Sequence, residues 1–260
     1  MANIIKMDLR RMSHSTLFAV SLLIIAGLNL VAGIAEPVVL RLIPTASNLK
    51  PTLISDLIAS PFSIPLLIIL LIMSAVSFFY ADFSGGYIKN IAGQVNNRST
   101  LVVSKFIVIG IHNMIFLLVG VVSRILGALV GIAMGGAIEF DALIPAALLT
   151  LLIKWMLIMA ICAILLFITT GVRNKTLASI IGVIIGTGAL GLVYLGLDAA
   201  VANIFKVNGF SISDYMPDQL ISSVSVGSNI AVINAIIVAL VCTAIFLSLA
   251  IKLFKIRDLK

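Results

Sequence analysis

Six long apolar runs constrain the fold of this chain more than any other feature of its sequence. The runs are roughly Leu17 to Ala35, Ser63 to Ala81, Phe106 to Gly135, Ala142 to Ile168, Leu177 to Leu197 and Ile230 to Ile251. A helix needs about 20 apolar residues to cross a hydrocarbon core of about 30 Å. The runs are longer and less alternating than the strands of a membrane barrel. We therefore predict a single all-α integral membrane domain over residues 1–260, with six transmembrane helices.

The composition excludes an ordinary soluble domain. Hydrophobic residues make up 62% of the chain and charged residues 10%, whereas soluble domains carry roughly 25% charged residues. The formal net charge is +7. Because the cations collect at the ends of the apolar runs, this charge indicates contact with anionic membrane lipid and no nucleic-acid partner.

Lysines and arginines occur mainly in alternate connections between the runs. They precede the first run, lie between the second and third and between the fourth and fifth, and follow the sixth: Lys6, Arg10, Arg11, Lys89, Arg98, Lys105, Arg173, Lys175, Lys252, Lys255, Arg257 and Lys260. The other connections are balanced or acidic, and the first of them contains Glu36. Since short cytoplasmic loops carry the excess of cations, we predict that both termini are cytoplasmic.

The first 14 residues predict an amphipathic helix at the cytoplasmic interface. Ile5, Leu9 and Met12 recur on one helical face, and Lys6 and Arg10 lie off that face, as in helices that lie on a membrane surface. A cleaved signal peptide is the alternative for this end of the chain. The first apolar run is longer than the usual signal-peptide core of about 7 to 15 residues, which disfavours cleavage.

The sequence lacks the motifs of a nucleotide-binding or metal-dependent enzyme. No G-x-x-x-x-G-K-[ST] occurs, and the two histidines lie far apart. Cys162 and Cys242 fall in different runs, which suits packing residues better than a metal site. The G-x-G-x-x-G match from Gly186 to Gly191 lies inside an apolar run rather than after a strand. We expect a non-catalytic chain that binds no cofactor or metal itself.

Glycines four residues apart predict close packing between helices. Gly127, Gly131 and Gly135 follow this spacing in the third run, and Gly182 and Gly186 follow it in the fifth. Small residues at this interval let two membrane helices approach closely.

The connection before the last run, residues 198–228, is too long and too apolar for a free linker. We expect short re-entrant-like helices folded back on the outer membrane face, forming an external gate or lid. An interfacial loop without a gating role is the alternative.

The connection at residues 82–105 reads DFSGGYIKNIAGQVNNRSTLVVSK. Ile88, Ile91 and Val95 recur at helical spacing, which predicts a short cytoplasmic helix with one apolar face. The acidic residue, the glycine, the Tyr-Ile-Lys-Asn run and the following cations resemble the type-2 ABC transporter permease family. The residues that carry this resemblance are Asp82, Gly86, Tyr87, Ile88, Lys89, Asn90, Arg98 and Lys105.

The resemblance implies the permease subunit of an ABC exporter in a bacterial cell membrane. A second permease chain, identical or related, would complete the pathway, and a separate ABC ATPase would bind ATP and Mg. The residues implied to contact that ATPase are Gly86, Tyr87, Ile88, Lys89, Asn90, Ile91 and Arg98. Amphipathic peptides or lipophilic compounds are the implied substrates, as in small peptide, lantibiotic and drug exporters. A membrane sensor or immunity protein that binds such peptides without moving them is the alternative function.

Arg124 and Lys154 are the two cations placed inside long runs, and each lies 15 residues from Glu139. Since Glu139 marks the turn between these runs, the two cations should share a depth near the bilayer centre. No carboxylate falls inside a run, so neither cation is expected to have an acidic neighbour there. An unpaired charge at that depth costs at least about 3 kcal/mol. We hypothesise that at least one of them lines a hydrated cavity between two permease chains and receives an anionic group. Snorkelling, or a structural bond to backbone carbonyls, is the alternative.

Overall fold

The computed structural model describes residues 2–42, 52–84, 99–172, 174–205, 211–226 and 229–256. Most of these residues are helical. The elements in chain order are α1 (Ala2–Ser13), α2 (Thr16–Leu42), β1 (Thr52–Leu53), α3 (Ile54–Ala59), α4 (Pro65–Ser84), α6 (Ser99–Ala133), β2 (Ile138–Glu139), α7 (Ile144–Val172), α8 (Lys175–Gly186), α9 (Leu190–Phe205), η2 (Ile212–Tyr215), α10 (Pro217–Ser223) and α11 (Asn229–Ile256).

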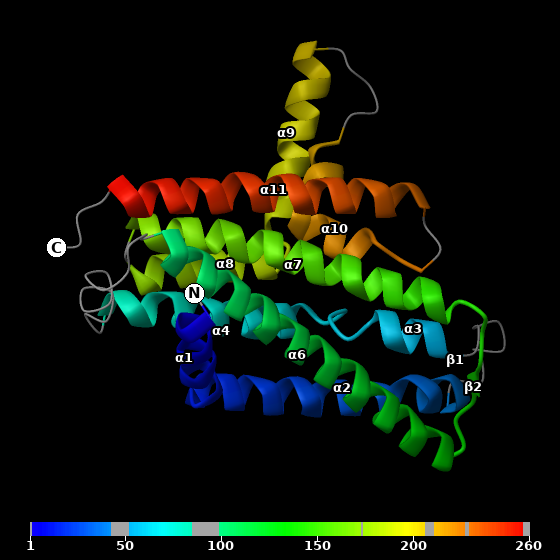
Figure 1. The fold of residues 1–260 in the computed structure, drawn as a ribbon. Helices are drawn as coiled ribbons and strands as arrows, with labels where there is room; N and C mark the ends of the chain where they lie inside the picture. Colours follow the sequence, from blue (N-terminus) through cyan, green and yellow to red (C-terminus); the bar gives the residue numbers. More distant parts are fainter. Residues whose placement is uncertain are drawn as a thin grey trace.

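The long helices lie side by side in a bundle (Figure 1). Helix α2 packs along α6, α11 along α7, and α8 along α4. Large apolar side chains such as Phe79, Phe116 and Leu157 are fully buried between them. The outward faces expose other large apolar side chains, including Leu23 and Leu118. Apolar residues on both the inner and the outer faces are what a helix bundle needs in a hydrocarbon solvent.

The predicted all-α membrane fold agrees with the structure. Among the described residues, four helical segments are long and apolar enough to cross a bilayer: Thr16–Val39, Ser99–Ala133, Ile144–Val172 and Val232–Ile256. Lys175–Gly186 and Leu190–Ala202 form a bent pair that would make a fifth span if counted together, and Pro65–Ala81 is a shorter apolar helix. The count of six spans and the side on which the termini lie therefore stay predictions.

The break between α8 and α9 corrects the expectation of one uninterrupted helix over Leu177 to Leu197. The two helices meet at an angle of 70°, and α9 points away from the bundle in Figure 1. Gly188 has a φ of +69° at the break, a conformation that side-chain-bearing residues rarely adopt. The glycine-rich stretch that begins at Gly186 therefore combines close packing with a change in chain direction.

The prediction of close packing is confirmed at Gly127, Gly131 and Gly182. A Cβ on Gly127 would overlap the Leu30 carbonyl oxygen of α2, and a Cβ on Gly131 would lie 2.5 Å from Pro37 Cγ. At Gly182 a Cβ would lie 2.6 Å from Ile72 Cγ2 of α4. Helices α2 and α6, and α4 and α8, can therefore approach closely only because these positions lack a side chain. Gly135 lies just beyond the end of α6.

The ends of α4 and α6 change the expected limits of the segment at residues 82–105. Helix α4 runs to Ser84 and α6 begins at Ser99, so Lys105 lies inside α6 rather than in a connection. Its side chain is buried, and Nζ lies 3.9 Å from an oxygen of the buried Asp8 on α1. Met12 of α1 is also buried, whereas Lys6 is exposed. Helix α1 thus packs on α6 with the apolar face that the sequence predicts.

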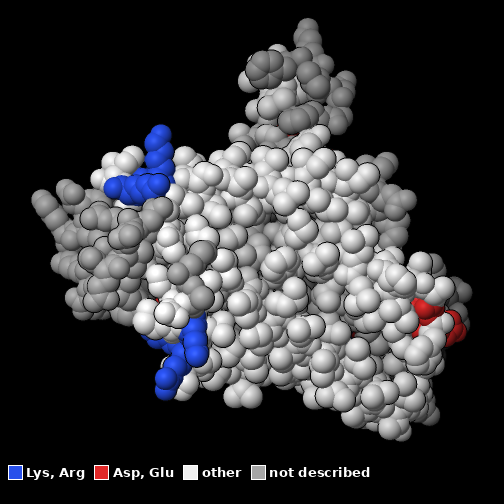
Figure 2. All heavy atoms as spheres, viewed as in Figure 1, with Lys and Arg blue, Asp and Glu red and all other residues white. Residues whose placement is uncertain are grey.

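Charged side chains separate toward the two ends of the bundle. On the face shown in Figure 2, lysines and arginines gather at one end and acidic residues at the other. Lys6 on α1 and Lys252 on α11 are among the exposed cations, and Glu139 is an exposed acid. This separation follows the sorting of charge along the sequence.

Candidate functional site

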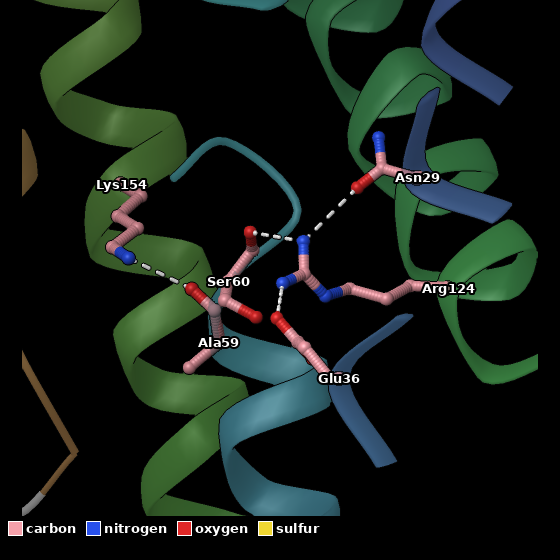
Figure 3. A network of polar contacts seen from close by, with 6 residues as sticks. All are labelled: Asn29, Glu36, Ala59, Ser60, Arg124 and Lys154. Carbon is pink, nitrogen blue, oxygen red and sulfur yellow. Dashed lines mark hydrogen bonds and ion pairs between the residues drawn. The ribbon is translucent and has the colours of Figure 1, made fainter. Parts of the chain in front are cut away.

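The short helix α3 brings two backbone carbonyl groups to the two cations that the sequence singles out. Strand β1 pairs in parallel with β2, with Thr52 opposite Ile138. The Asp141 carboxylate accepts a hydrogen bond of 3.2 Å from the Ser55 backbone N–H at the start of α3. These contacts fix α3 so that its last turn, at Ala59 and Ser60, reaches between α6 and α7 (Figure 3).

Arg124 on α6 is surrounded by hydrogen-bond acceptors. Its guanidinium donates to the Glu36 carboxylate of α2, to the Ser60 carbonyl oxygen at 3.0 Å and to Asn29 Oδ1 at 3.5 Å. The side chain is 4% exposed, whereas the Glu36 side chain is 38% exposed. A buried guanidinium with a carboxylate and two neutral acceptors is held in one position.

The ion pair with Glu36 shows that one expectation was wrong, since neither cation was expected to have an acidic neighbour. The error comes from the end of α2, which was expected near Ala35 but lies at Leu42. Pro37 suggests a helix end, yet it is buried within α2 and packs against Gly131 and Gly136 of the following segment. Helix α2 thus continues for about two further turns, packed against α6, and Glu36 lies on the first of them.

Lys154 on α7 makes a sparser set of contacts. Its ammonium donates to the Ala59 carbonyl oxygen at 2.7 Å, and this is its one hydrogen bond among the residues that the structure describes. The residue is 8% exposed. Arg124 and Lys154 thus approach adjacent carbonyls from opposite sides of the same chain segment (Figure 3). Both cations bond to backbone carbonyls, as the structural alternative expected, and their common depth in the membrane stays a prediction.

A first hollow, here called the α3 hollow, opens beside both cations. Its volume is about 490 Å³. The charged residues around it are Arg124, Lys154, Glu36 and Asp56, and its other lining residues come mainly from α3 and the end of α10. Since Arg124 and Glu36 bind each other, the charges left facing the space are those of Lys154 and Asp56.

A second hollow, the α8 hollow, lies on the other side of Lys154 and has a volume of about 360 Å³. It is lined by the break after α8, by α10 and by the beginning of α4. Ser63, Lys154 and Ser222 line both hollows. Lys154 therefore stands where the two spaces adjoin.

The described part of the connection before α11 is folded, as expected, into short helices. Asp198 of α9 accepts the Ile212 backbone N–H at 2.7 Å and the Ser211 hydroxyl at 2.8 Å, which holds the start of η2. Helix α10 packs against α7 and α11, with Leu220 and Ile221 buried. The segment thus closes one side of the α8 hollow, and its role as a gate stays a proposal.

The residues expected to contact an ATPase lie outside the described residues. They are Gly86, Tyr87, Ile88, Lys89, Asn90, Ile91 and Arg98. The structure therefore brings together the two cations of the predicted site, Arg124 and Lys154, and does not place the coupling segment.

The sequence reading missed the partners of the cations, although the sequence carries a signal for them. Asn29, Gly33 and Glu36 recur at intervals of four and three residues, as do Gly120, Arg124 and Gly127. Each set lies on one helical face. A Cβ on Gly33 would overlap the Arg124 carbonyl oxygen, so the two faces meet. Placing these two helical faces against each other predicts that α2 packs on α6 and that Glu36 pairs with Arg124.

A second buried polar group lies within the bundle. Ser74 on α4 bonds to His112 Nε2 at 2.9 Å, and His112 Nδ1 lies 3.1 Å from Asn113 Oδ1. The Asn113 amide lies 3.5 Å from Cys162 Sγ on α7. These bonds join α4, α6 and α7. Among the described residues, no group of three or more His, Cys, Asp or Glu side chains could hold a metal ion.

Comparison with protein families shows that residues 4–190 match the family described as ABC-2 family transporter protein. The match covers more than half of the chain, including α2, α6, α7 and both cations, and ends at the break between α8 and α9. Comparison with curated proteins gives no match.

Proposed function

Because the chain belongs to the ABC-2 transporter family, we propose that it is the permease subunit of an ATP-driven exporter in a bacterial cell membrane. A separate ABC ATPase hydrolyses ATP, and a second permease chain, identical or related, completes the pathway. The observation that carries this proposal is the family match over residues 4–190, and the helical bundle agrees with it. Amphipathic peptides or lipophilic compounds are the proposed substrates, since the hollows join apolar walls to a buried cation.

The proposed orientation places the basic end of the bundle in the cytoplasm, next to the ATPase. The exposed cations of α1 and α11 lie at that end, as expected for residues in contact with the anionic inner leaflet. The hollows, α3 and the acidic turn at Glu139 lie toward the opposite end. In this orientation the hollows belong to the outer half of the pathway, and the segment from η2 to α10 is the proposed outer gate.

The proposed ATPase contact is the segment from Gly86 to Arg98. Ile88, Ile91 and Val95 recur on one face of the predicted helix, and an apolar face on a cytoplasmic helix fits a groove of a partner. Lys89 and Arg98 flank that face and would stay hydrated. This arrangement predicts that apolar contacts hold the ATPase to the permease.

A pull-down from the host membrane tests this contact and the function together. The tagged chain should recover an ABC ATPase, and the Ile88→Asp/Ile91→Asp variant should insert normally but lose at least about tenfold of that recovery, because each aspartate places a charge in the apolar contact. The Asn96→Asp/Asn97→Asp variant adds the same charge to the same connection and should keep the recovery.

The sensor or immunity alternative makes the opposite prediction for the pull-down. A chain that only binds peptides would reach the membrane without any ATPase and would move no substrate when ATP is supplied. Absence of an ATPase in mild detergent, together with unchanged behaviour of the Ile88→Asp/Ile91→Asp variant, would reject the exporter proposal.

A further inference from the structure

The two buried cations differ in how much hydrogen-bonding capacity their surroundings occupy. Arg124 donates to a carboxylate and to two neutral oxygens. An ammonium has three N–H donors, and Lys154 has one hydrogen bond among the described residues, to the Ala59 carbonyl. Lys154 therefore keeps donors for a further acceptor, whereas the charge of Arg124 is already balanced by Glu36.

The carboxylates that line the two hollows either have other partners or lie away from the bond between Lys154 and Ala59. Glu36 pairs with Arg124. Asp218, which lines the α8 hollow, accepts hydrogen bonds from the Tyr194 hydroxyl and from the Gln219 amide. Asp56, which lines the α3 hollow, is exposed in the first turn of α3, whereas Lys154 bonds to the last turn. No ion pair joins Lys154 to a described acidic residue, so an anion entering the hollows would meet an unpaired ammonium.

The α8 hollow offers an apolar wall next to this ammonium. Phe62, Pro65, Ile68, Ile161, Ile185 and Ile221 line it. Thr187 and Gly188, where the helix is broken, line it as well. Irregular backbone at membrane depth is tolerated where it lines a cavity, and broken helices of this kind form binding sites in transporters. A volume of about 360 Å³ is at the lower end of the range for small-molecule sites.

We infer that Lys154 binds the anionic head group of an amphipathic ligand whose apolar part lies in the α8 hollow. Arg124 bonds to the neighbouring Ser60 carbonyl but is not among the residues that line the α8 hollow. The site lies within one chain, between α3, α7, the α8 break and α10, rather than between two permease chains. The inference deepens the proposed function, on which it rests for the role of the site in transport, and it names the chemistry of the bound molecule as an anion joined to an apolar chain.

Direct binding to the full-length chain tests the inference without an ATPase. The chain is placed in phosphatidylcholine nanodiscs, and dodecanoyl-glycine is compared with dodecanoyl-glycinamide, which lacks the charge. The carboxylate should bind at least about tenfold tighter than the amide, because a charge-assisted hydrogen bond is lost with the amide. Lys154→Gln should bind the carboxylate and the amide about equally, and Lys154→Arg should keep the preference for the carboxylate.

Two further variants separate the site from its neighbours. The double variant Arg124→Gln/Glu36→Gln neutralises the adjacent ion pair and should keep the preference for the carboxylate. Ser222→Phe places a large side chain at an exposed position that lines both hollows, and it should weaken binding of both probes. Because Ser222 is exposed, this variant removes no buried contact and tests the hollow even if Lys154→Gln folds poorly.

The source of the anion is distinguished by lipid composition. If adding phosphatidylglycerol to the nanodiscs displaces the probe from the wild type, an anionic lipid head group is the occupant; if it does not, a free amphipathic anion is. Retention of the full preference in a folded Lys154→Gln chain, or no effect of Ser222→Phe on either probe, would overturn the inference. Because these assays contain neither ATP nor an ATPase, a failed pull-down would reject the exporter proposal while leaving the binding result intact.

Discussion

Arg124 and Lys154 bond to adjacent carbonyls, yet their surroundings differ. Arg124 is enclosed by α2, where Asn29 and Glu36 flank Gly33 on one face. Lys154 on α7 lines two hollows. These hollows lie between α3, the α8 break and α10. Close helix packing places a carboxylate beside the guanidinium in the first case. In the second, next to a broken helix, the ammonium has no acidic partner among the described residues. The comparison teaches that two buried cations bonded to the same chain segment can differ in how far their charge is balanced.

The largest effect on stability is expected from Glu36→Gln. This change leaves the buried Arg124 guanidinium without its counter-ion and should cost about 3 kcal/mol, because an uncompensated buried charge is strongly destabilising. Arg124→Gln should cost less, since the remaining Glu36 side chain is 38% exposed and faces the α3 hollow. Chemical unfolding in detergent micelles measures both values. A smaller cost for Glu36→Gln than for Arg124→Gln would contradict the conclusion that Glu36 balances the charge of the buried Arg124.

The packing that brings α2 to Arg124 is tested by a pair of glycine substitutions. Gly127→Ala should destabilise by about 2 kcal/mol, because its Cβ would overlap the Leu30 carbonyl and force the helices apart. Gly27→Ala is the matched control on α2, where a Cβ would meet nothing within 4 Å. The control should raise stability by up to about 1 kcal/mol through helix propensity. Equal effects of the two substitutions in thermal unfolding would argue against close packing of α2 on α6.

At the second cation, Lys154→Gln should change the free energy of unfolding by less than about 1 kcal/mol. Glutamine can still donate to the Ala59 carbonyl, and the change removes a buried charge that has no described counter-ion. The same unfolding assay measures it beside Glu36→Gln. A cost as large as that of Glu36→Gln would show that Lys154 is as fully engaged in the fold as Arg124, which would contradict the comparison.

The smallest effect concerns the outer contact that positions α3 for both cations. The hydrogen bonds from Ser55 hold the pKa of Asp141 below its ordinary value of 3.8. A lowered pKa in the folded state means that the carboxylate stabilises the fold above pH 3.8, and that this contribution is lost as the pH falls through the folded-state pKa. The thermal midpoints of the wild type and Asp141→Asn should therefore differ slightly near neutral pH and converge in acid. If the two thermal midpoints still differed below the folded-state pKa, the stabilisation would not come from the ionised Asp141 carboxylate.

The sequence was sufficient to predict those features that depend on local pattern. Apolar run length predicted the membrane helices, and the four-residue glycine spacing predicted where helices touch. Each of these signals needs only the geometry of a helix.

The features that the sequence reading missed depend on tertiary contacts. Pro37 predicts a helix end, but packing against Gly131 keeps α2 helical to Leu42. Helix α3 is six residues long, too short for a periodicity signal, and its position depends on pairing of β1 with β2 and on Asp141. The break at Gly188 was hidden because an apolar run does not show where a glycine adopts a positive φ. The first two errors removed partners of the cations from the predicted site, and the third hid part of the wall of the α8 hollow.

ATP-dependent movement of an amphipathic anion tests the central claim most directly. Proteoliposomes containing the chain and the ATPase recovered with it are given dodecanoyl-glycine, and its transfer across the membrane is measured with ATP, with ATP and vanadate, and without nucleotide. The account predicts transfer that requires ATP, stops with vanadate and falls at least about tenfold in Lys154→Gln but not in Lys154→Arg. Transfer that is the same with and without ATP, or that is equal in the wild type and Lys154→Gln, would contradict it.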